Sequence, residues 1–151
     1  MRVLVINGPN LNLLGVRRPE VYGATTLAEL EERCRAWAAA LGIEVETCQS
    51  NHEGEIIDRL HDALGWADGV VLNPGALTHY SYALHDAIEA VALPVVEVHL
   101  SDTARREEWR ARSVVSPACV ATIGGHGVEG YREALELLAG RAGTPSRDER
   151  E

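Results

Sequence analysis

The sequence predicts an α/β fold, a doubly wound sandwich in which a five-stranded parallel sheet carries helices on both faces. Five short apolar runs alternate along the chain with five segments of helical periodicity, which is the order typical of parallel βαβ units. Runs such as Val70-Val71-Leu72 are continuous and do not alternate with polar residues, as expected for strands buried on both faces. These observations favour the flavodoxin-like variant of this architecture.

The expected elements follow one another without internal repeats. The expected strands are Val3–Ile6, Ile43–Cys48, Gly69–Leu72, Val95–Val98 and Val120–Ile123. The expected helices are Thr26–Leu41, Glu55–Leu64, Ser81–Val91, Ala104–Ala111 and Val128–Leu138. The first of these helices is the best defined, since its apolar residues recur with the 3.6-residue period of an amphipathic helix. Thr26 and Glu29 have the spacing of a capping box at its start, and Gly42 is expected to end it.

Length and composition indicate one globular domain. The chain has 151 residues, of which 46% are hydrophobic and 25% are charged, values close to those of an average globular protein. Residues 1–140 are expected to form this single domain. The polar segment 141–151 lacks periodicity and is expected to be a disordered tail.

Charge, apolar run length and cysteine content restrict the partners and the compartment. The formal net charge of −9 argues against a nucleic acid partner, which requires a basic surface. There is no run of 18 apolar residues that would predict a membrane span, and the N-terminus shows no signal-peptide pattern. The three cysteines form no C-x-x-C pair, which is typical of reduced thiols. A cytoplasmic protein with a small-molecule ligand is expected.

Polar residues and histidines gather directly after the expected strands. The five segments are Asn7–Asn10, Gln49–Gly54, Asn73–His79, His99–Asp102 and Gly124–Gly127. They contain four of the six histidines of the chain. Because the carboxyl ends of parallel strands lie at one edge of a sheet, this pattern predicts a ligand site at that edge.

The loop after the first strand, residues 7–23, is long for a compact α/β domain and reads NGPNLNLLGVRRPEVYG. Long ordered loops are often lids or binding loops, although a plain surface loop with solvated arginines is the simpler alternative. Arg17 and Tyr22 fall within reach of each other in this loop. Because a guanidinium at contact distance favours an ionised phenol, the pair suits a general base that removes a proton from carbon.

Six motifs in a fixed order give the sequence a specific resemblance. They are NGPNLNLLG, RRPEVYG, QSNHEGEIID, NPGALTHYSYAL, VEVHLS and REEWR, and GYREAL follows near the C-terminus. In these stretches, which cover nearly the whole domain, the chain resembles the type II 3-dehydroquinate dehydratases of the shikimate pathway. The resemblance implies a flavodoxin-like hydro-lyase that converts 3-dehydroquinate to 3-dehydroshikimate in chorismate and aromatic amino acid biosynthesis.

The resemblance implies roles for four catalytic residues. Tyr22 matches the general base that takes a proton from C2, and Arg17 matches the arginine that favours its ionised form. Asn10 matches an asparagine that holds an ordered water against the oxygen of the enolate. His99 matches the general acid that protonates the C1 hydroxyl on the opposite face, so the elimination is anti.

The resemblance also implies substrate-binding and supporting groups. Those expected to contact substrate are the side chains of Asn73, His79 and Arg110, the backbone amides of Leu100 and Ser101, and Asp86, which matches an acid that reaches a neighbouring subunit's site. Glu97 lies two residues before His99 on one strand, so both side chains point the same way and Glu97 is expected to orient the imidazole. Arg106 matches a further arginine near the lid.

No metal and no cofactor are implied, and the resemblance implies a homododecamer built as a tetramer of trimers. The chain contains no lysine, which excludes a Schiff-base mechanism such as that of the unrelated type I enzymes. Two positions depart from the family pattern: Arg18 stands where Glu or Gln is usual, and Asp102 where Asn is usual. Arg18 is expected to face solvent and Asp102 to cap the next helix.

Other interpretations have less support in the sequence. Gly125-x-Gly127-x-x-Gly130 has the spacing of a dinucleotide fingerprint, but no later strand supplies the required acidic residue. The histidines lack the tight pair typical of a zinc site. Two alternatives would use the same sheet edge: a flavodoxin-like binding or regulatory module, and a related lyase acting on another cyclic hydroxy-ketone.

Overall fold

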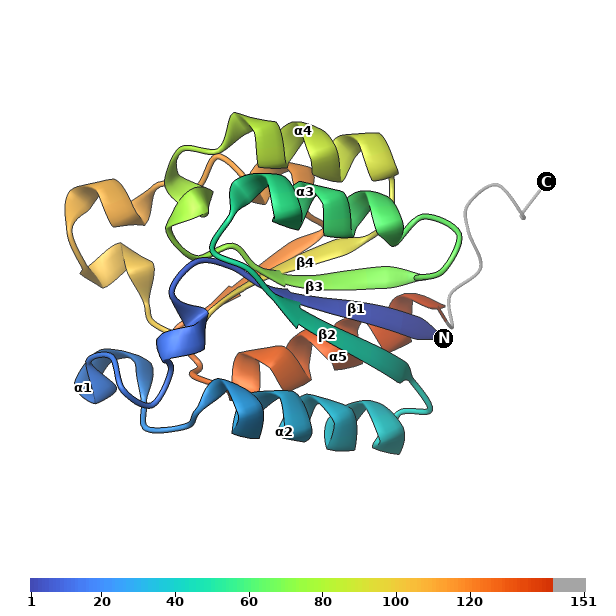
Figure 1. Cartoon of the computed structure of the whole chain (residues 1–151), viewed down its shortest axis with the longest axis horizontal. Coiled ribbons are helices and arrows are strands. Elements are labelled where there is room, and N and C mark those ends of the chain that lie inside the picture. Colours follow the sequence, from blue (N-terminus) through green and yellow to red (C-terminus); the bar gives the residue numbers. More distant parts are fainter. Residues whose placement is uncertain (143–151) are drawn as a thin grey trace.

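A computed structural model of the chain describes residues 1–142. The strands are β1 (Arg2–Asn7), β2 (Glu44–Gln49), β3 (Gly69–Asn73), β4 (Val95–His99) and β5 (Ala121–Gly124). They form one parallel sheet in the order β2-β1-β3-β4-β5 (Figure 1). This is the strand order of flavodoxin-like folds, with its switch point between β1 and β3. The predicted fold class is confirmed.

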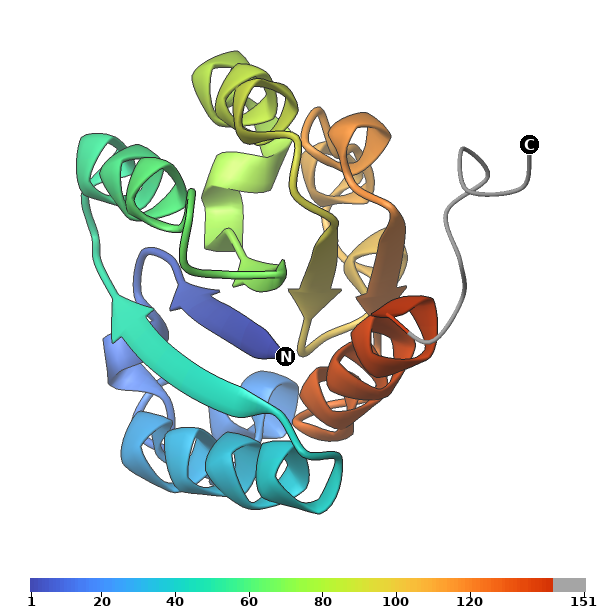
Figure 2. The ribbon, with the colours of Figure 1, turned by 90° about the vertical axis from the view of Figure 1, so that its right-hand side faces the viewer.

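Helices cover both faces of the sheet. They are α1 (Pro19–Tyr22), α2 (Leu27–Ala40), α3 (Glu53–Asp62), α4 (Tyr82–Val91) and α5 (Glu129–Ala142). Short 3-10 helices lie in the connections: η1 (Leu11–Leu13), η2 (Gly75–His79), η3 (Thr103–Arg105), η4 (Glu108–Ala111) and η5 (Ser116–Ala118). α2 and α5 lie on one face, and α3 and α4 on the other (Figure 2). Within residues 1–142, no helix has the length and apolar character needed to cross a membrane.

Two hydrophobic cores follow from the alternation of side chains along each strand. From β1, Val3 and Val5 enter the core beneath α2 and α5, whereas Leu4 and Ile6 enter the core beneath α3 and α4. All four side chains are buried, and burial of each stabilises the fold by roughly 1.5–3 kcal/mol. The strands are therefore fixed in register, and their carboxyl ends meet at one edge.

The predicted boundaries of the first long helix are confirmed by its caps. The Thr26 hydroxyl accepts a hydrogen bond from the backbone N–H of Glu29 (3.2 Å), which satisfies one of the free donors at the start of α2. At its other end, Gly42 adopts a φ of +71°, the left-handed conformation that ends many helices. α2 thus begins at Leu27, shortly after the long loop ends at Gly23.

Two predicted segments differ from the structure. The expected helix over Ala104–Ala111 is instead the two 3-10 helices η3 and η4, separated at Arg106 and Glu107. This segment has no apolar stripe to bury, because Trp109 is its one large apolar residue and is 52% exposed. α5 continues to Ala142, so the first two residues of the expected tail are helical. The remainder of that tail, residues 143–151, lies outside the described residues.

Candidate active site

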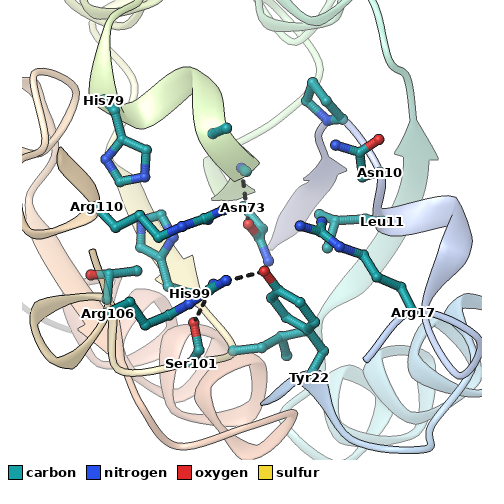
Figure 3. A pocket seen from close by; sticks show the side chains of 15 residues that line it. Asn10, Leu11, Arg17, Tyr22, Asn73, His79, His99, Ser101, Arg106 and Arg110 are labelled. Carbon is teal, nitrogen blue, oxygen red and sulfur yellow. Dashed lines mark hydrogen bonds between the residues drawn. The ribbon is translucent and has the colours of Figure 1, made fainter. Parts of the chain in front are cut away.

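A pocket lies at the carboxyl edge of the sheet, beside the ends of β1, β3 and β4. The predicted site residues that line it are Asn10, Arg17, Tyr22, Asn73, His79, His99, Leu100, Ser101, Arg106 and Arg110 (Figure 3). They come from the long loop, from the ends of β3, η2 and β4, and from η4 and the residues before it. The edge predicted from the polar loops is therefore the edge that carries a pocket.

Tyr22 is presented to the pocket by α1, a helix of four residues inside the segment that was predicted to be a loop. Pro19 occupies its first position, where the missing N–H has no cost. Arg18 enters the turn with a left-handed φ of 35°, and Gly23 leaves it at a φ of +84°. As predicted, the Arg18 side chain is exposed, and it pairs with Glu20 (3.3 Å). This tight turn returns the phenol toward the sheet.

The phenol of Tyr22 is held between two guanidinium groups (Figure 3). Arg106 Nη1 donates a hydrogen bond to the phenol oxygen at 2.7 Å. The Arg17 guanidinium lies over the face of the ring, with its central carbon 4.6 Å from the ring centroid. Arg17 was expected to be the cation that acts on the phenol, and Arg106 only a further arginine near the lid. In the structure both contact Tyr22, and Arg106 is the one bonded to the oxygen.

His99 ends β4 and is paired with a buried carboxylate from the same face of that strand. Its Nε2 lies 3.0 Å from Glu97 Oε1, as expected from their two-residue spacing. Since the carboxylate accepts, Nε2 carries the hydrogen, and Nδ1 is the nitrogen left for the pocket. Burial alone would raise the pKa of Glu97, but His99 and the hydroxyls of Ser116 and Thr78 lower it to about 2. Glu97 is thus ionised at neutral pH.

Asn73 is fixed by a hydrogen-bond chain beneath the pocket. Its Nδ2 donates to the Tyr131 hydroxyl (3.0 Å), and that hydroxyl donates to Asn7 Oδ1 (2.6 Å). Asn73 Oδ1 accepts from the backbone N–H of Gly75 (3.1 Å). These contacts set the orientation of the amide and leave one Nδ2 hydrogen for a ligand. Tyr131 is fully buried and belongs to this network.

His79 is oriented by its second ring nitrogen. Nδ1 lies 2.6 Å from the carbonyl oxygen of Arg112 and must donate to it, so Nε2 is the nitrogen left for a ligand. The imidazole packs edge-on against Trp109, with ring centroids 5.0 Å apart. Arg110 lies over the same indole at 4.2 Å. Trp109 therefore contacts both pocket side chains, a role that no sequence pattern indicated.

The pocket is prepared for an anion. Arg106 Nη2 is buried and has no hydrogen-bond partner among the described residues, which is costly for a cationic donor unless a ligand supplies an acceptor. Arg17 and Arg110 also line the pocket, as do Leu100 and Ser101. A carboxylate-bearing ligand fits this arrangement of donors.

Two predicted positions lie apart from the pocket lining. Asp86 is an exposed residue of α4 and does not line the pocket. Asp102 precedes η3, and its carboxylate pairs with Arg105 of that helix (Oδ2–Nε 3.1 Å). Because both side chains of this pair are largely exposed, it adds little to stability.

The hydroxyl groups around Glu97 were not identified from the sequence. They belong to Thr78, Ser113, Ser116 and Thr122, and each donates to the carboxylate of Glu97. They come from three separate segments, which are η2, residues 113–116 and β5, so no single motif joins them. Only the fold of the chain around the end of β4 brings them together.

Comparison with known proteins gives a consistent result. The family model described as dehydroquinase class II matches residues 1–139. A 3-dehydroquinate dehydratase from Caldicellulosiruptor saccharolyticus is 54% identical over 138 residues, which cover 91% of this chain and 95% of that protein. A catabolic 3-dehydroquinase from Verticillium alfalfae is 52% identical over 138 residues, which cover 91% of this chain and 92% of that protein. The crystal structure of a type II dehydroquinase from Butyrivibrio crossotus is 46% identical, with a TM-score of 0.90 over 91% of this chain and 97% of that one.

Proposed function

This chain belongs to the class II dehydroquinase family, and from that premise we propose that its 3-dehydroquinate dehydratase activity is carried out in the pocket between Tyr22 and His99. The enzyme removes water from 3-dehydroquinate to give 3-dehydroshikimate. One observation carries the assignment of the site: a phenol bonded to a guanidinium faces the same pocket as an imidazole bonded to a buried carboxylate.

In the proposed first step, Tyr22 as phenolate takes a proton from C2 of the substrate. The C–H bonding electrons move toward the adjacent carbonyl, which becomes an enolate. Arg106 at the phenol oxygen and Arg17 over the ring place two positive charges beside this phenolate. Asn10, which lines the same pocket, is assigned to the water that hydrogen-bonds the developing enolate oxygen.

In the second step, the enolate electrons form the new carbon–carbon double bond as the C1 hydroxyl departs. His99 gives the hydrogen on Nδ1 to this hydroxyl, and water leaves on the face opposite to the one that Tyr22 deprotonates. The imidazole is then neutral, with its remaining hydrogen on Nε2 directed at Glu97. The buried carboxylate thus orients the imidazole and compensates its positive charge before the transfer.

The remaining lining residues are assigned to substrate binding. Asn73 Nδ2, His79 Nε2 and Arg110 are assigned to the substrate hydroxyls. The amides of Leu100 and Ser101 are assigned to its carboxylate, next to the donor of Arg106 that has no partner among the described residues.

We further propose that the enzyme is a cytoplasmic homododecamer, a tetramer of trimers, that does not bind nucleic acid. Asp86 is exposed on α4 outside the pocket lining, which suits a residue that acts in a neighbouring subunit. Tyr80 and Tyr82, near the start of α4, are also exposed and supply apolar surface for a contact between subunits. The free cysteines Cys34, Cys48 and Cys119 suit a reducing compartment.

A direct assay tests the assignment of the site. The purified enzyme is given 3-dehydroquinate, and the conjugated enone of the product is followed by its ultraviolet absorbance. Tyr22→Phe is expected to lower kcat by about 10²–10⁴-fold, the usual contribution of a general base. Arg18→Ala, an exposed position in the same loop, is the matched control and is expected to retain activity. Full activity in Tyr22→Phe would remove the phenol from the mechanism, and ligand binding without turnover would favour a binding module.

A further inference from the structure

The carboxylate of Glu97 is enclosed by hydroxyl groups. Oε1 accepts from Thr78, from Ser113 (3.1 Å) and from the imidazole of His99. Oε2 accepts from Ser116, from Thr122 (3.1 Å) and, at the longer distance of 3.4 Å, from Ser113. We call Thr78, Ser113, Ser116 and Thr122 the hydroxyl cage. None of these side chains lines the substrate pocket, and Glu97 itself is completely buried.

A buried carboxylate–imidazole pair has two ways to hold one proton. The proton can stay on the imidazole, which gives an ion pair, or it can move to the carboxylate, which gives a neutral pair. Removal from water favours the neutral pair, because burial penalises both charges. Hydroxyl hydrogens directed at the carboxylate oxygens favour the ionised form and so oppose this effect.

The location of this proton matters for general acid catalysis. An imidazolium gives up the hydrogen on Nδ1 readily, since the product is a neutral ring. A neutral imidazole whose Nε2 proton has moved to Glu97 still carries a hydrogen on Nδ1, but losing it would leave an anionic ring. A carboxylate with too high a proton affinity would therefore weaken His99 as an acid.

We infer that the hydroxyl cage is a set of positioning residues that keeps the shared proton on His99, so that Nδ1 remains an effective acid toward the leaving hydroxyl. The inference deepens the proposed function and rests on it for the identity of the leaving group. The cage residues act through Glu97 and do not touch the substrate.

The other titratable groups near the pair do not replace the cage. Cys119 is a titratable group on which the charge of Glu97 acts: burial and this charge raise the pKa of its thiol to about 12, so it stays neutral. On the pocket side, the charged or titratable side chains that share the lining with His99 are Arg17, Tyr22, His79, Arg106 and Arg110. None of the latter group is hydrogen-bonded to Glu97 among the described residues, so the hydroxyls are its main stabilising contacts besides His99.

Ser116→Ala combined with Thr122→Val tests the inference, because it removes the two closest hydroxyl donors to Oε2 and keeps the side chains close in size. Ser113 is left intact, since its oxygen also accepts the backbone N–H groups of Val115 and Ser116. The double variant is expected to lower kcat at least about tenfold with less than about threefold change in KM, the pattern of an effect on a chemical step. The alkaline limb of its kcat–pH profile is expected to move to higher pH, because the Glu97–His99 pair then holds its proton more tightly.

The nitrogen-15 NMR signals of His99 give a readout that does not depend on turnover. In the protonated pair of the unaltered enzyme, both ring nitrogens are expected to show the shifts of an imidazolium. In the double variant, the Nε2 signal is expected to move toward that of a nitrogen without a hydrogen. The His99 signals are assigned by their loss in His99→Asn.

Control variants separate the hydroxyl from the rest of the side chain. Thr122→Ser keeps the hydroxyl and is expected to restore the properties lost in Thr122→Val. Thr47→Val makes the same change on β2, away from the pocket lining, and is expected to leave kcat and the His99 signals unchanged. If the double variant does not fold, Ser116→Ala and Thr122→Val are measured singly. Each is expected to lower kcat and to shift the Nε2 signal in the direction expected for the double variant.

Imidazolium signals and a kcat–pH profile equal to those of the unaltered enzyme would overturn the inference. Failure of the proposed function gives a different result. In that case the unaltered enzyme would not convert 3-dehydroquinate, while the NMR comparison would still report where the proton lies in the Glu97–His99 pair.

Discussion

At the scale of single residues, the site is built from paired groups in which one partner controls the chemistry of the other. Arg106 is hydrogen-bonded to the oxygen of Tyr22, Glu97 to one ring nitrogen of His99, and Tyr131 to the amide of Asn73. In each pair the group with the proposed chemistry faces the pocket, and its partner lies beside or beneath it. The partners are therefore as important to test as the groups that meet the substrate.

Arg106 is expected to be as important as its contact with the phenol oxygen implies. Arg106→Ala removes a charge-assisted hydrogen bond of 2.7 Å, and such bonds contribute roughly 1.5–3 kcal/mol. A loss in kcat/KM of about 10- to 100-fold is expected from steady-state kinetics with 3-dehydroquinate. Arg105→Ala is the matched control, because the neighbouring side chain is 87% exposed. Equal effects of the two substitutions would contradict this assignment.

Tyr131 is expected to matter through its hydroxyl. Tyr131→Phe leaves Asn73 Nδ2 and Asn7 Oδ1 without their shared partner in a fully buried position. A loss of roughly 1–3 kcal/mol in the free energy of unfolding is expected for such unsatisfied groups, together with a raised KM. Urea denaturation and steady-state kinetics measure the two effects. Tyr80→Phe, at an exposed tyrosine, should change neither quantity. If Tyr131→Phe left both the unfolding free energy and KM unchanged, the hydrogen-bond chain from Asn73 to Asn7 would be dispensable.

At the scale of secondary structure, the cap of α2 fixes the point where the long loop ends. Thr26→Ala removes the hydroxyl that accepts from Glu29, and loss of such a cap costs about 0.5–2 kcal/mol. A lower thermal midpoint is expected with little change in kcat at low temperature, since Thr26 does not line the pocket. Thr25→Ala removes an adjacent threonine hydroxyl and serves as the control in the same thermal scan. A midpoint unaffected by Thr26→Ala would mean that tertiary packing alone holds the start of α2.

The elements themselves were largely predictable, for identifiable reasons. β1 and β3 contain continuous apolar runs, and α2 and α4 have buried apolar residues and side-chain N-caps, so local sequence and burial agree. The helix predicted over Ala104–Ala111 was wrong because the charged residues of this segment resemble the exposed surface of a helix, but the segment has no apolar face to bury. α1 was missed because four residues provide too little periodicity to detect. Both segments contribute side chains to the pocket lining: Arg106 and Arg110 come from the first, and Tyr22 comes from α1.

At the scale of the whole molecule, the sequence could predict which edge of the sheet carries the site but not what supports it. Parallel strands place their carboxyl ends together, so polar loops such as Asn73–His79 were expected to converge there. The hydroxyl cage could not be predicted, because Thr78 and Thr122 are 44 positions apart by their numbers and become neighbours only in the folded chain. Their common feature is a contact with Glu97, which no sequence pattern describes.

Glu97 also links the site to the stability of the whole molecule. In the folded chain its pKa is about 2, below the ordinary value of 4.5, so on acidification the unfolded chain takes up this proton first. The stabilisation is therefore fully present above about pH 5 and is lost as the pH falls toward 2. Its full size is about 3 kcal/mol, at about 1.4 kcal/mol for each tenfold difference in proton affinity.

Glu97→Gln abolishes this titration while keeping the shape of the side chain, so the pH dependence of stability isolates its contribution. The difference in unfolding free energy between the unaltered enzyme and Glu97→Gln is expected to shrink by about 2 kcal/mol between pH 7 and pH 3. Urea denaturation at one fixed protein concentration measures it, since association would otherwise change the apparent stability. Glu32→Gln, on the exposed side of α2, is the control for removing a carboxylate. A difference that stays constant with pH would mean that the pKa of Glu97 is the same in the folded and the unfolded chain, and a difference that grows as the pH falls would mean that Glu97 is protonated in the folded enzyme. Either result would remove the ion pair with His99 as the basis of the acid step.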